Sequence, residues 1–505
     1  MPVRRHPVHL FRVLSRVICR WFLAGLDRGG DLSLRGGRTP GYVFADRKRL
    51  GPFGFFRKGC KPRKRIPLAI LAGGCLRLLP NEPDVSSPGL QMLAALALAA
   101  LPQGIWVVDP QNSPGSHFTQ LQPAVDAAGP GDLIIVKAGN YSSFQVTGKG
   151  ISIVAENPGT VAVASNSGLD PAAPSRVSQV PMDERFILRD LQFTGNFGLE
   201  LAGNEGAVAL ENLQLTPSSW FIPSFPPGPI QPNDRFCAEQ ALRIQDCALV
   251  WVTGCQVEGA QTLYDLTVPS FLPDTVCAAS PSASSSGSTV VFQDSYLRSA
   301  GDGYAGFAAS QSSLFAVNSE FEGGSGLSFG PSALVQYGFD GGNGIDLVDS
   351  SFWDYGATLT GGPAGFATAL SGTHPTAGQP IELEGASDHL EDVASVTSLE
   401  VSGLLQGGLP ATIRAYTEEA AAIFLIGSAE WGGVHAAPLH GVLAASGFPY
   451  LLSLGVVAAG GQEFSFPIPA LPPGTPPIVL THQLGTVDGL GFIQLSAPTW
   501  SFLIP

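Results

Sequence analysis

FILRDLQF (residues 186–193) and VALENLQL (208–215) open a series of six related phrases. Each phrase reads apolar, any, apolar, any, then Asp, Asn or Gly, then a small residue or Leu, any, apolar. The other four are VWVTGCQV (250–257), VVFQDSYL (290–297), LFAVNSEF (314–321) and IDLVDSSF (345–352). Their starting positions differ by 22, 42, 40, 24 and 31 residues, which is typical of one or two turns of a solenoid with loops of variable length.

Each phrase predicts two short strands that meet at a sharp corner. The first and third residues lie on one face, because side chains alternate along a strand. The fifth residue is Asp, Asn or Gly in every copy, and these types tolerate the left-handed backbone of a bend. After the bend, the sixth and eighth residues point inward again.

Stacked coils should therefore carry two inward ladders. One ladder would hold Phe193, Leu215, Val257, Leu297, Phe321 and Phe352, and the other Leu188, Leu210, Val252, Phe292, Ala316 and Leu347. A lone coil cannot bury such residues, whereas stacked coils share one continuous apolar axis. An amphipathic helix would need spacings of three and four, which the phrases lack. The sequence predicts an all-β chain built on a parallel β-helix.

The segment just before the repeats carries a family resemblance. From Phe118 it reads FTQLQPAVDAAGPGDLIIVKAGNYSSFQVTGKGISIVAENPGTVAV. It resembles the opening of secreted right-handed parallel β-helix proteins of the pectin methylesterase and pectate lyase-like superfamily. The matching residues are Phe118, Thr119, Leu121, Gln122, Ala124, Val125, Asp126, Gly131, Asp132, Ile134, Val136, Gly139 and Tyr141. The resemblance implies a right-handed β-helix over residues 104–371 whose open end is covered by an N-terminal capping helix.

The catalytic motifs of those enzymes do not accompany the resemblance. Pectin methylesterases carry paired Asp residues, a Gln and an Arg in set local motifs, and the one echo here is Phe292-Gln293-Asp294-Ser295. Asp294 occupies the corner position of a phrase, which favours a turn residue over a catalytic carboxylate. Whether the chain is an enzyme is left open by the sequence.

Charge divides the chain into two parts. Residues 1–80 hold 18 of the 27 Lys and Arg residues and 3 of the 41 Asp and Glu residues, so their net charge is +15. The remainder holds 9 basic and 38 acidic residues, a net charge of −29. So acidic a body is a poor partner for nucleic acid, because it repels phosphate. It is compatible with neutral or cationic ligands and with a divalent metal ion.

Residues 1–103 are expected to be a basic, disordered leader with an export signal. Met92 opens the apolar run MLAALALAAL and is a possible true start, with Ala97-Leu98-Ala99 as a cleavage candidate. A lipoprotein-like alternative lies upstream, where a basic run precedes IPLAILAGG and Cys75. Neither run has the roughly 20 uninterrupted apolar residues of a membrane span. We expect a secreted or cell-envelope protein with no membrane span in the mature chain, and a monomer.

Two further motifs suggest a disulfide and a metal site. Cys237 and Cys277 lie in two long insertions that flank the third phrase, and they are the expected disulfide pair. Cys255 occupies an inward position and is expected to be a small buried apolar residue. Residues 341–348 read GGNGIDLV, which fits one copy of a calcium-binding nonapeptide and makes Asp340 and Asp346 weak calcium candidates. No other cofactor is implied.

The insertions supply the candidate ligand-binding residues. They run from Thr216 to Gln240 and from Glu258 to Ser288. Aromatic rings on a rigid scaffold suit the apolar faces of sugars, which points to Trp220, Tyr264 and the outward Trp251. The alternative is that these rings pack among themselves in a small satellite cluster. Three amides, Gln192, Gln214 and Gln256, should form an outward polar column beside them.

The pattern changes near residue 372. Residues 372–379 are a linker rich in Thr, Pro and Gly, and residues 380–505 show seven short alternating runs separated by turn signals. Such runs predict a small antiparallel β-sandwich.

Three functions fit the sequence. The first is an exported protein that binds polysaccharide or cell-envelope material without catalysis. The second is a polysaccharide lyase or carbohydrate esterase of the pectin-degrading type, whose catalytic groups converge from separate coils. The third is a structural surface or adhesion spacer.

Overall fold

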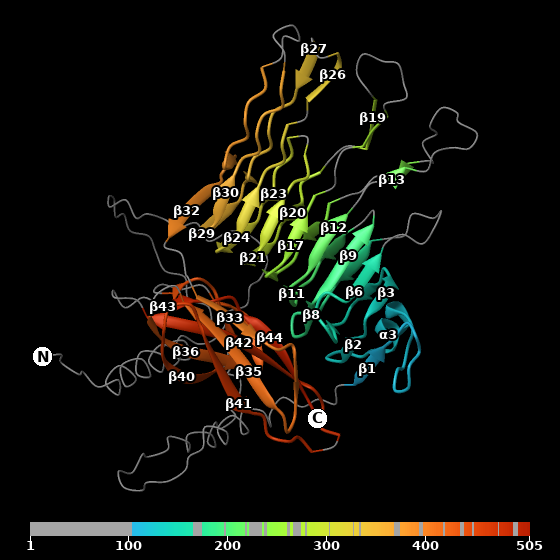
Figure 1. Cartoon of the computed structure of the whole chain (residues 1–505), viewed down its shortest axis with the longest axis vertical. Helices are drawn as coiled ribbons and strands as arrows, with labels where there is room; N and C mark the ends of the chain where they lie inside the picture. Colours follow the sequence, from blue (N-terminus) through green and yellow to red (C-terminus); the bar gives the residue numbers. More distant parts are fainter. Residues whose placement is uncertain are drawn as a thin grey trace, which may run out of the picture. The chain divides into compact units, whose positions relative to one another are not determined.

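The computed structural model describes residues 104–505 with several gaps. The gaps are residues 165–173, 196–197, 218–219, 222–234, 237–239, 260–262, 266–273, 278–279, 302, 327, 333–334, 368–373, 393–396, 418–419, 435–438, 447–448, 473 and 488–492. The described residues form a solenoid of parallel strands followed by a domain of two packed sheets (Figure 1). Both belong to one unit of the chain, Asp84–Pro505.

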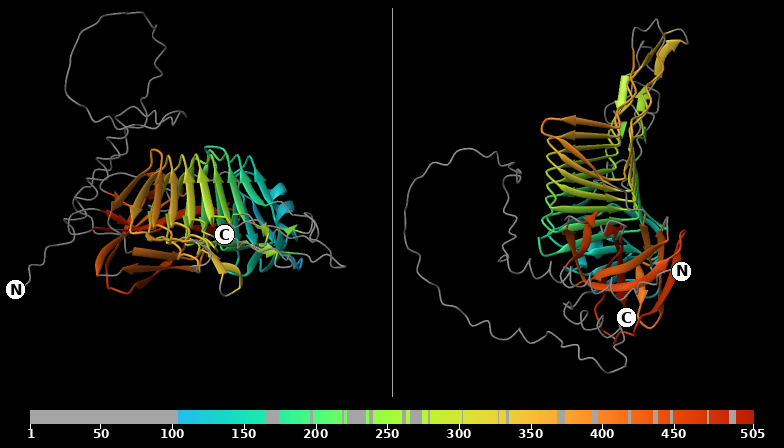
Figure 2. Two further views of the ribbon diagram at one scale, coloured as in Figure 1. Left: turned by 90° about the horizontal axis from the view of Figure 1, so that it is seen from above. Right: turned by 90° about the vertical axis from the view of Figure 1, so that its left-hand side faces the viewer.

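Three parallel sheets form the solenoid, and their strands stack in rows in Figure 2. Sheet A contains β1 (Ile105–Val108), β2 (Leu133–Val136), β5 (Ser152–Ala155), β8 (Arg185–Arg189), β11 (Ala207–Glu211), β16 (Leu249–Thr253), β21 (Thr289–Gln293), β24 (Ser313–Val317), β29 (Ser351–Tyr355) and β32 (Asp388–Asp392). Sheet B contains β3 (Gly139–Ser142), β6 (Val161–Ala164), β9 (Leu191–Gly195), β12 (Gln214–Pro217), β17 (Gln256–Glu258), β22 (Tyr296–Arg298), β25 (Glu320–Glu322) and β30 (Thr358–Thr360). Sheet C contains β4 (Gln145–Thr147), β7 (Ser175–Ser178), β10 (Leu199–Ala202), β15 (Leu242–Gln245), β20 (Ala283–Ser286), β23 (Phe307–Ser310), β28 (Ile345–Val348) and β31 (Ile381–Glu384).

Each coil runs from sheet A to sheet B, then to sheet C and back to sheet A. Residues one coil apart pair in parallel register, so that Leu188 lies beside Leu210 and Leu210 beside Val252. This is the arrangement of a parallel β-helix, and the predicted stack of coils is confirmed. The parallel pairing continues through β31 and β32, past residue 371 where the sequence predicted the solenoid to end.

Left-handed backbone recurs at two of the corners of the coils. Between sheets A and B, φ is 64° at Asp190 and 53° at Asn212. Between sheets C and A, φ is 50° at Asp246 and 49° at Asp349. Asp and Asn tolerate this conformation better than other residues with a side chain. Asp294, with a φ of 48°, is therefore the turn residue that the sequence favoured.

The corner between sheets C and A explains an error in the predicted ladders. The first five phrases start on sheet A and end on sheet B, but IDLVDSSF starts on β28 of sheet C and ends at Phe352 on β29 of sheet A. Phe352 pairs with Leu314, and Leu359 continues the column of Phe321. Leu347 likewise lies in sheet C and not above Ala316. The prediction was wrong for this copy because both corners use the same residue types.

The inward side chains form one apolar core along the solenoid. Phe193, Leu215 and Phe352 are all buried, as expected for inward positions. Phe292 contacts Phe307 and Phe321, with ring centroids 4.9 and 5.3 Å apart.

A short helix, α3 (Leu121–Ala127), covers the first coil. It buries Leu121, Ala124 and Val125 against the solenoid core. Lys149 Nζ donates hydrogen bonds to the carbonyl oxygens of Val125 and Ala128, 2.5 and 2.7 Å away, which satisfies carbonyls at the helix C-terminus. Phe118 lies before the helix, not on it, and packs against the same core. The predicted cap is therefore present, as a helix of seven residues.

Three antiparallel hairpins project from connections between sheets B and C. They are β13 (Trp220–Phe221) with β14 (Arg235–Phe236), β18 (Leu263–Asp265) with β19 (Asp274–Cys277), and β26 (Ser328–Ser332) with β27 (Val335–Gly338). The first two lie in the predicted insertions. The second insertion is shorter than expected, because its last residues form β20 of sheet C.

The glycine-rich motif at residue 341 belongs to a stack of close-packed loops. Gly342 N donates to Gly324 O, and Gly362 N donates to Gly342 O, each over 2.7 Å. A Cβ on Gly342 would lie 1.9 Å from the carbonyl oxygen of Tyr304. Only glycine allows the loops to approach this closely, so packing accounts for the motif.

The C-terminal domain consists of two main sheets, mostly antiparallel. One contains β33 (Thr397–Val401), β35 (Pro410–Thr417) and β41 (Gln462–Pro467). The other contains β34 (Leu404–Gln406), β44 (Thr499–Ile504), β42 (Ile478–Val487), β36 (Ala421–Ser428) and β40 (Tyr450–Val457). In the same sheet, β43 (Ile493–Leu495) pairs with β42, and β38 (Leu439–His440) pairs with β43. A hairpin of β37 (Glu430–Val434) and β39 (Leu443–Ser446) completes the domain. Ile413, Ile423 and Leu484 share a core between the sheets, the packing expected of a sandwich.

This domain packs on the outer face of sheet A. Trp251 of β16 lies between solenoid residues and Trp500 of β44, with ring centroids 6.4 Å apart, and Trp431 of β37 contacts Trp500 at 5.2 Å. All three indoles are at most 3% exposed.

Candidate functional site

A groove of about 750 Å³ crosses the outer face of sheet C from β15 to β31. We call it the serine groove, because Ser284 and Ser286 of β20 and Ser310 of β23 lie along its floor. Ala308 completes this floor of small side chains. Longer side chains lie at both ends. The groove therefore exists because the residues that pair across the middle strands of sheet C are small.

The register shows how the groove is built. One outward row runs Arg243, Ser284, Ala308, Asp346 and Glu382, each paired with the next. The parallel row beside it runs Gln245, Ser286, Ser310, Val348 and Glu384. With strands about 4.8 Å apart, three steps separate Arg243 from Asp346 by about 14 Å.

The two ends of the groove differ in charge. Arg243 and Gln245 stand at one end, and Asp346, Glu382 and Glu384 at the other. Burial raises the pKa of Asp346 above 3.8, with further contributions from the charges of Glu382 and Glu384. Three carboxylates against one guanidinium leave the groove net acidic, which disfavours anionic ligands such as uronates or phosphates.

Hydrogen-bonding groups line the whole groove. Ser284 Oγ donates to Gln240 Oε1 over 2.6 Å. Asn343 Nδ2 donates to Asp346 Oδ1 over 2.8 Å and also to Glu382 Oε2. The groove therefore offers amide, hydroxyl and carboxylate groups at several points along its length.

Two lining hydroxyls are buried without a hydrogen-bond partner. Within the described part of the chain, neither Ser280 Oγ nor Ser285 Oγ has one. A buried polar group left unpaired costs roughly 1–3 kcal/mol. Ser285 lies on the inward face of β20, in register with the buried Ile244, so a ligand in the groove could supply a partner only to Ser280.

The structure stacks the predicted glutamine column on sheet B. Gln192 pairs with Gln214, and Gln214 with Gln256, in register. The three side chains are exposed or half-buried on the outer face. They lie outside the serine groove, and Gln192 and Gln214 line a different groove described below.

The predicted aromatic residues do not come together as a described ligand site. Trp251 is on an outward position, as expected, but the C-terminal domain covers it completely. It is therefore a docking residue and is unavailable to a ligand. Trp220 and Tyr264 lie in β13 and β18, and their side chains fall outside the described part of the structure.

The two calcium candidates serve separate partners. The Asp340 carboxylate accepts hydrogen bonds from Thr376 N and Thr376 Oγ1 at 2.6 and 3.0 Å, whereas Asp346 lies in the serine groove. The described residues contain no group of three or more His, Cys, Asp or Glu side chains that could hold a metal ion.

The structure tests the prediction for Cys255 but not the predicted disulfide. Cys255 is 2% exposed and belongs to the solenoid core, where burial raises its thiol pKa to about 12. It is the small buried residue that its inward position predicted. Cys237 lies outside the described residues and the side chain of Cys277 is likewise not described, so their pairing stays a prediction.

The serine floor is not predicted by the sequence. The segment from Ser280 to Ser288 is so polar that it reads as part of the insertion, although Ala283 and Ser285 alternate with the outward Ser284 and Ser286. The alternation was the available signal, but small polar residues carry little hydrophobic periodicity.

Comparisons with known proteins leave the family unassigned. No protein-family model matches the chain, and no curated protein matches it. One solved structure, a superoxide reductase (neelaredoxin) from Ignicoccus hospitalis, matches at 13% identity over 22% of this chain and 80% of that one, with a TM-score of 0.14. So low a score carries no argument about fold or function. Among the described residues, no helix is long and apolar enough to cross a membrane.

Proposed function

We propose that this chain is an exported right-handed β-helix protein that binds a neutral polysaccharide along the serine groove without cleaving it. The observation that carries the proposal is the groove itself, a long floor of small residues bordered by polar side chains and lined by the unpaired hydroxyl of Ser280. Polysaccharides present hydroxyl groups at intervals along an extended chain, which suits a groove that crosses several coils. The family resemblance of the segment from Phe118 supports a pectin lyase-like scaffold and secretion.

The charge of the groove narrows the ligand class. Asp346, Glu382 and Glu384 repel the carboxylates of a uronate polymer, so the preferred ligand is uncharged. Described lining residues of the groove include no aromatic side chain, so recognition rests on hydrogen bonds. We therefore expect moderate affinity that depends on several consecutive sugars.

A second candidate function is a carbohydrate-active enzyme. Asp346 and Glu382 share the amide of Asn343 as a donor, and the raised pKa of Asp346 is the property required of a general acid. Paired carboxylates are the usual catalytic groups of glycoside hydrolysis. Arg243 is too far from Asp346 to act on the same bond, which disfavours a lyase that needs both.

Binding and turnover can be separated by one set of measurements. A panel of neutral, amino and uronate oligosaccharides would be titrated into the full chain, and each mixture would then be assayed for new reducing ends and for unsaturated products. We expect binding of neutral oligosaccharides and no products. Cleavage that Asp346→Asn abolishes would support the enzyme, and preferential uronate binding would contradict the proposal.

A matched pair of variants tests whether the saccharide binds in the serine groove. Ser310→Trp places a bulky side chain on the groove floor, and we expect it to weaken binding at least tenfold. Thr194→Trp places the same side chain on an exposed position of sheet B, outside the groove, and should bind as the unmodified chain does. Equal binding by both variants would show that the serine groove is not the site.

A further inference from the structure

A second groove, of about 670 Å³, lies between the solenoid and the C-terminal domain. We call it the interdomain groove. Its solenoid wall comes from the corners between sheets A and B and includes Gln192, Asn212 and Gln214. Its other wall comes from β33, β35 and β41 and includes Arg414 and Glu463. Neither domain forms this groove alone.

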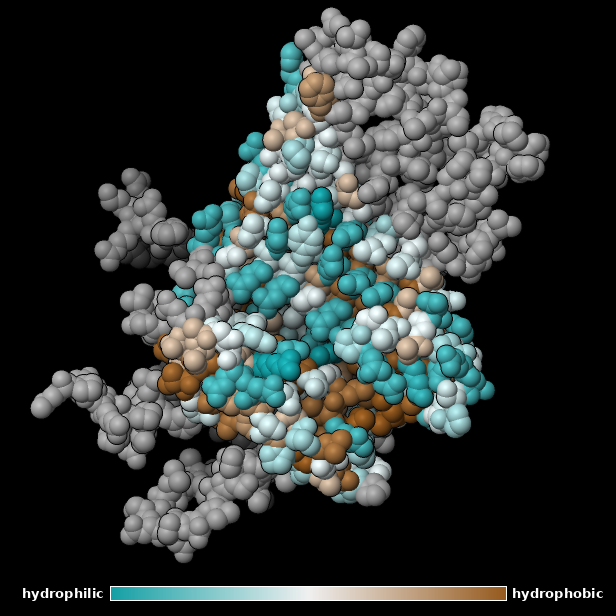
Figure 3. All heavy atoms as spheres, in the orientation of Figure 1, coloured by the Kyte–Doolittle hydropathy of each residue, from teal (hydrophilic) through white to brown (hydrophobic). Residues whose placement is uncertain are grey.

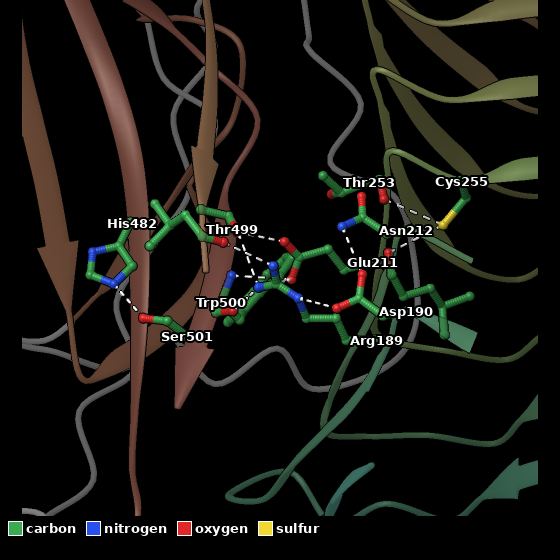
Figure 4. Close-up of polar contacts among 12 residues, drawn as sticks. Arg189, Asp190, Glu211, Asn212, Thr253, Cys255, His482, Thr499, Trp500 and Ser501 are labelled. Atoms are coloured by element: carbon green, nitrogen blue, oxygen red, sulfur yellow. Dashed lines mark hydrogen bonds and ion pairs between the residues drawn. The ribbon is translucent and has the colours of Figure 1, made fainter. Parts of the chain in front are cut away.

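Buried polar contacts hold the two walls in place (Figure 4). Arg189 Nη2 donates to Val401 O over 3.0 Å, and Arg189 Nη1 donates to Glu211 Oε2 over 3.2 Å. The Glu211 carboxylate also accepts hydrogen bonds from Thr499 Oγ1 and Trp500 N. Arg189 and Glu211 are at most 5% exposed, so this network fixes the position of the C-terminal domain beside the groove.

Both walls of the interdomain groove carry hydrogen-bond donors and acceptors. Gln192 and Gln214 are neighbours in register, and each carboxamide offers both an N–H donor and a carbonyl acceptor. On the facing wall, Arg414 Nε donates to Glu463 Oε2 over 3.2 Å, and Arg414 Nη1 lies 3.5 Å from Glu400 Oε2. Planar amide, guanidinium and carboxylate groups in this density suit the paired hydroxyls of a sugar.

The charge of the interdomain groove disfavours anionic ligands. Glu156, Glu400 and Glu463 are exposed carboxylates, and the exposed Arg414 is ion-paired with the last two. Arg189 and Asp190 also line the groove, but their charges are paired with each other over 3.0 Å. The net charge of the exposed lining is therefore negative, which disfavours phosphate and uronate.

We propose that the interdomain groove is a second saccharide-binding site, specific for uncharged oligosaccharides, that exists only while the C-terminal domain is docked on sheet A. This goes beyond the function of the serine groove, which belongs to the solenoid alone. The two sites face different sheets, so one chain can hold two segments of polysaccharide. Simultaneous occupancy by one polymer raises the effective affinity without any new contact.

The experiment counts binding sites on the full chain. The probes are cello-, xylo- and manno-oligosaccharides, titrated by calorimetry. We expect two saccharides per chain, falling to one in Gln214→Trp, which fills the interdomain groove. Gln256→Trp changes the next residue of the same outward column, outside the groove, and should keep both sites.

The serine groove serves as the internal reference. In Ser310→Trp the interdomain site should be the one that remains, and adding Gln214→Trp should then abolish binding. If the serine groove does not bind, Gln214→Trp reduces the count from one to none, so failure of the proposed function is distinguishable. An unchanged count in Gln214→Trp, or no binding of any probe, would overturn the inference.

A second variant tests the dependence on docking. Glu211→Ala removes the acceptor of the Arg189, Thr499 and Trp500 contacts, and we expect it to weaken the interdomain site at least tenfold while the serine groove keeps its affinity. Equal affinity at both sites in this variant, together with limited proteolysis that shows a released C-terminal domain, would contradict the requirement for docking.

Discussion

Single residues at the corners of each coil account for both the success and the error of the sequence analysis. Asp190 and Asn212 were placed at bends because few other residue types accept a positive φ, and the structure confirms both. The same rule cannot distinguish the two corners of a coil. Asp349 has the φ of a corner residue, but it joins sheets C and A, so Phe352 was assigned to the wrong column.

Gly342 provides a stability test at this scale. A methyl group there would meet the carbonyl oxygen of Tyr304 at 1.9 Å, so Gly342→Ala must separate stacked loops. We expect a loss of at least 2–3 kcal/mol in the free energy of unfolding, within the range of severe single substitutions. Gly129→Ala is the control, since its nearest neighbour is Asp132 Oδ2 at 3.8 Å. Urea denaturation of both variants would measure the difference, and equal stability would contradict the stacking of these loops.

The buried carboxyl group of Glu211 should make the stability of the protein depend on pH. Burial, the largest influence, raises its carboxyl pKa from 4.5 to about 7, against the opposing effect of Arg189. The folded state therefore binds this proton more tightly than the unfolded state, and stability falls as pH rises from about 4.5 through 7. The full effect corresponds to about 3 kcal/mol. Glu211→Gln keeps the shape without the charge and should flatten the decline.

The stabilities of the unmodified chain and of Glu211→Gln must be compared at each pH. His482, whose pKa is lowered to about 4 by burial and by Arg189, contributes the opposite slope below about pH 6.5, and it is present in both. The difference in melting temperature between Glu211→Gln and the unmodified chain should therefore grow from pH 5 to pH 8. A difference that is constant across this range would contradict the buried, proton-binding carboxyl.

At the scale of elements, the outer face of sheet A shows what a sequence can and cannot reveal. Period-two alternation placed Trp251 outward, and the structure agrees. The pattern does not say what covers an outward residue, because the covering strand, β44, lies far along the chain. Arg189 and Glu211 were similarly outward in the repeat phrases, and their burial follows only from the docked domain.

Truncation of Trp251 tests this docking surface. Its indole contacts Trp500 and is fully buried, so Trp251→Ala should lower the stability of the docked protein by about 3–5 kcal/mol. Trp251→Phe retains most of the apolar volume and should lose much less. Thermal unfolding and protease sensitivity would report both. If the two variants behave alike, the contact with Trp500 does not hold the domains together.

The cap offers another test at this scale. Val125 of α3 is buried on the first coil, so Val125→Asp would place an unpaired charge in the core and expose the end of the solenoid. We expect lower stability and self-association, because uncovered strand ends pair with other chains. Asp126→Ala, an exposed position on the same helix, is the control. Light scattering would show oligomers in the first variant and none in the second.

For the whole molecule, the sequence predicted the architecture better than the site. The stack of coils and the domain of alternating strands follow from periodicity, which is a property of the sequence itself, and the cap follows from the family resemblance. The serine groove depends on which small residues meet across Ser284, Ala308 and their neighbours after three coils have been aligned. Loop lengths between coils vary too much for spacing to reveal that alignment. The site can therefore be recognised only once the structure gives the strand register.

Export is also a property of the whole molecule and remains a proposal. The apolar run that begins at Met92 predicts a cleaved signal. Expression of the full chain with a C-terminal tag, followed by cell fractionation and N-terminal sequencing, should locate a processed protein outside the cytoplasm. An unprocessed chain in the cytoplasm would contradict the expected export.

The most direct test of the account is a crystal structure of the full chain grown with a neutral oligosaccharide that binds in the titrations. We predict electron density for the sugar along the outer face of sheet C, between Arg243 and Asp346, with its hydroxyl groups bonded to the serine floor. Density for the ligand only elsewhere, with the serine groove filled by solvent at saturating concentration, would contradict it.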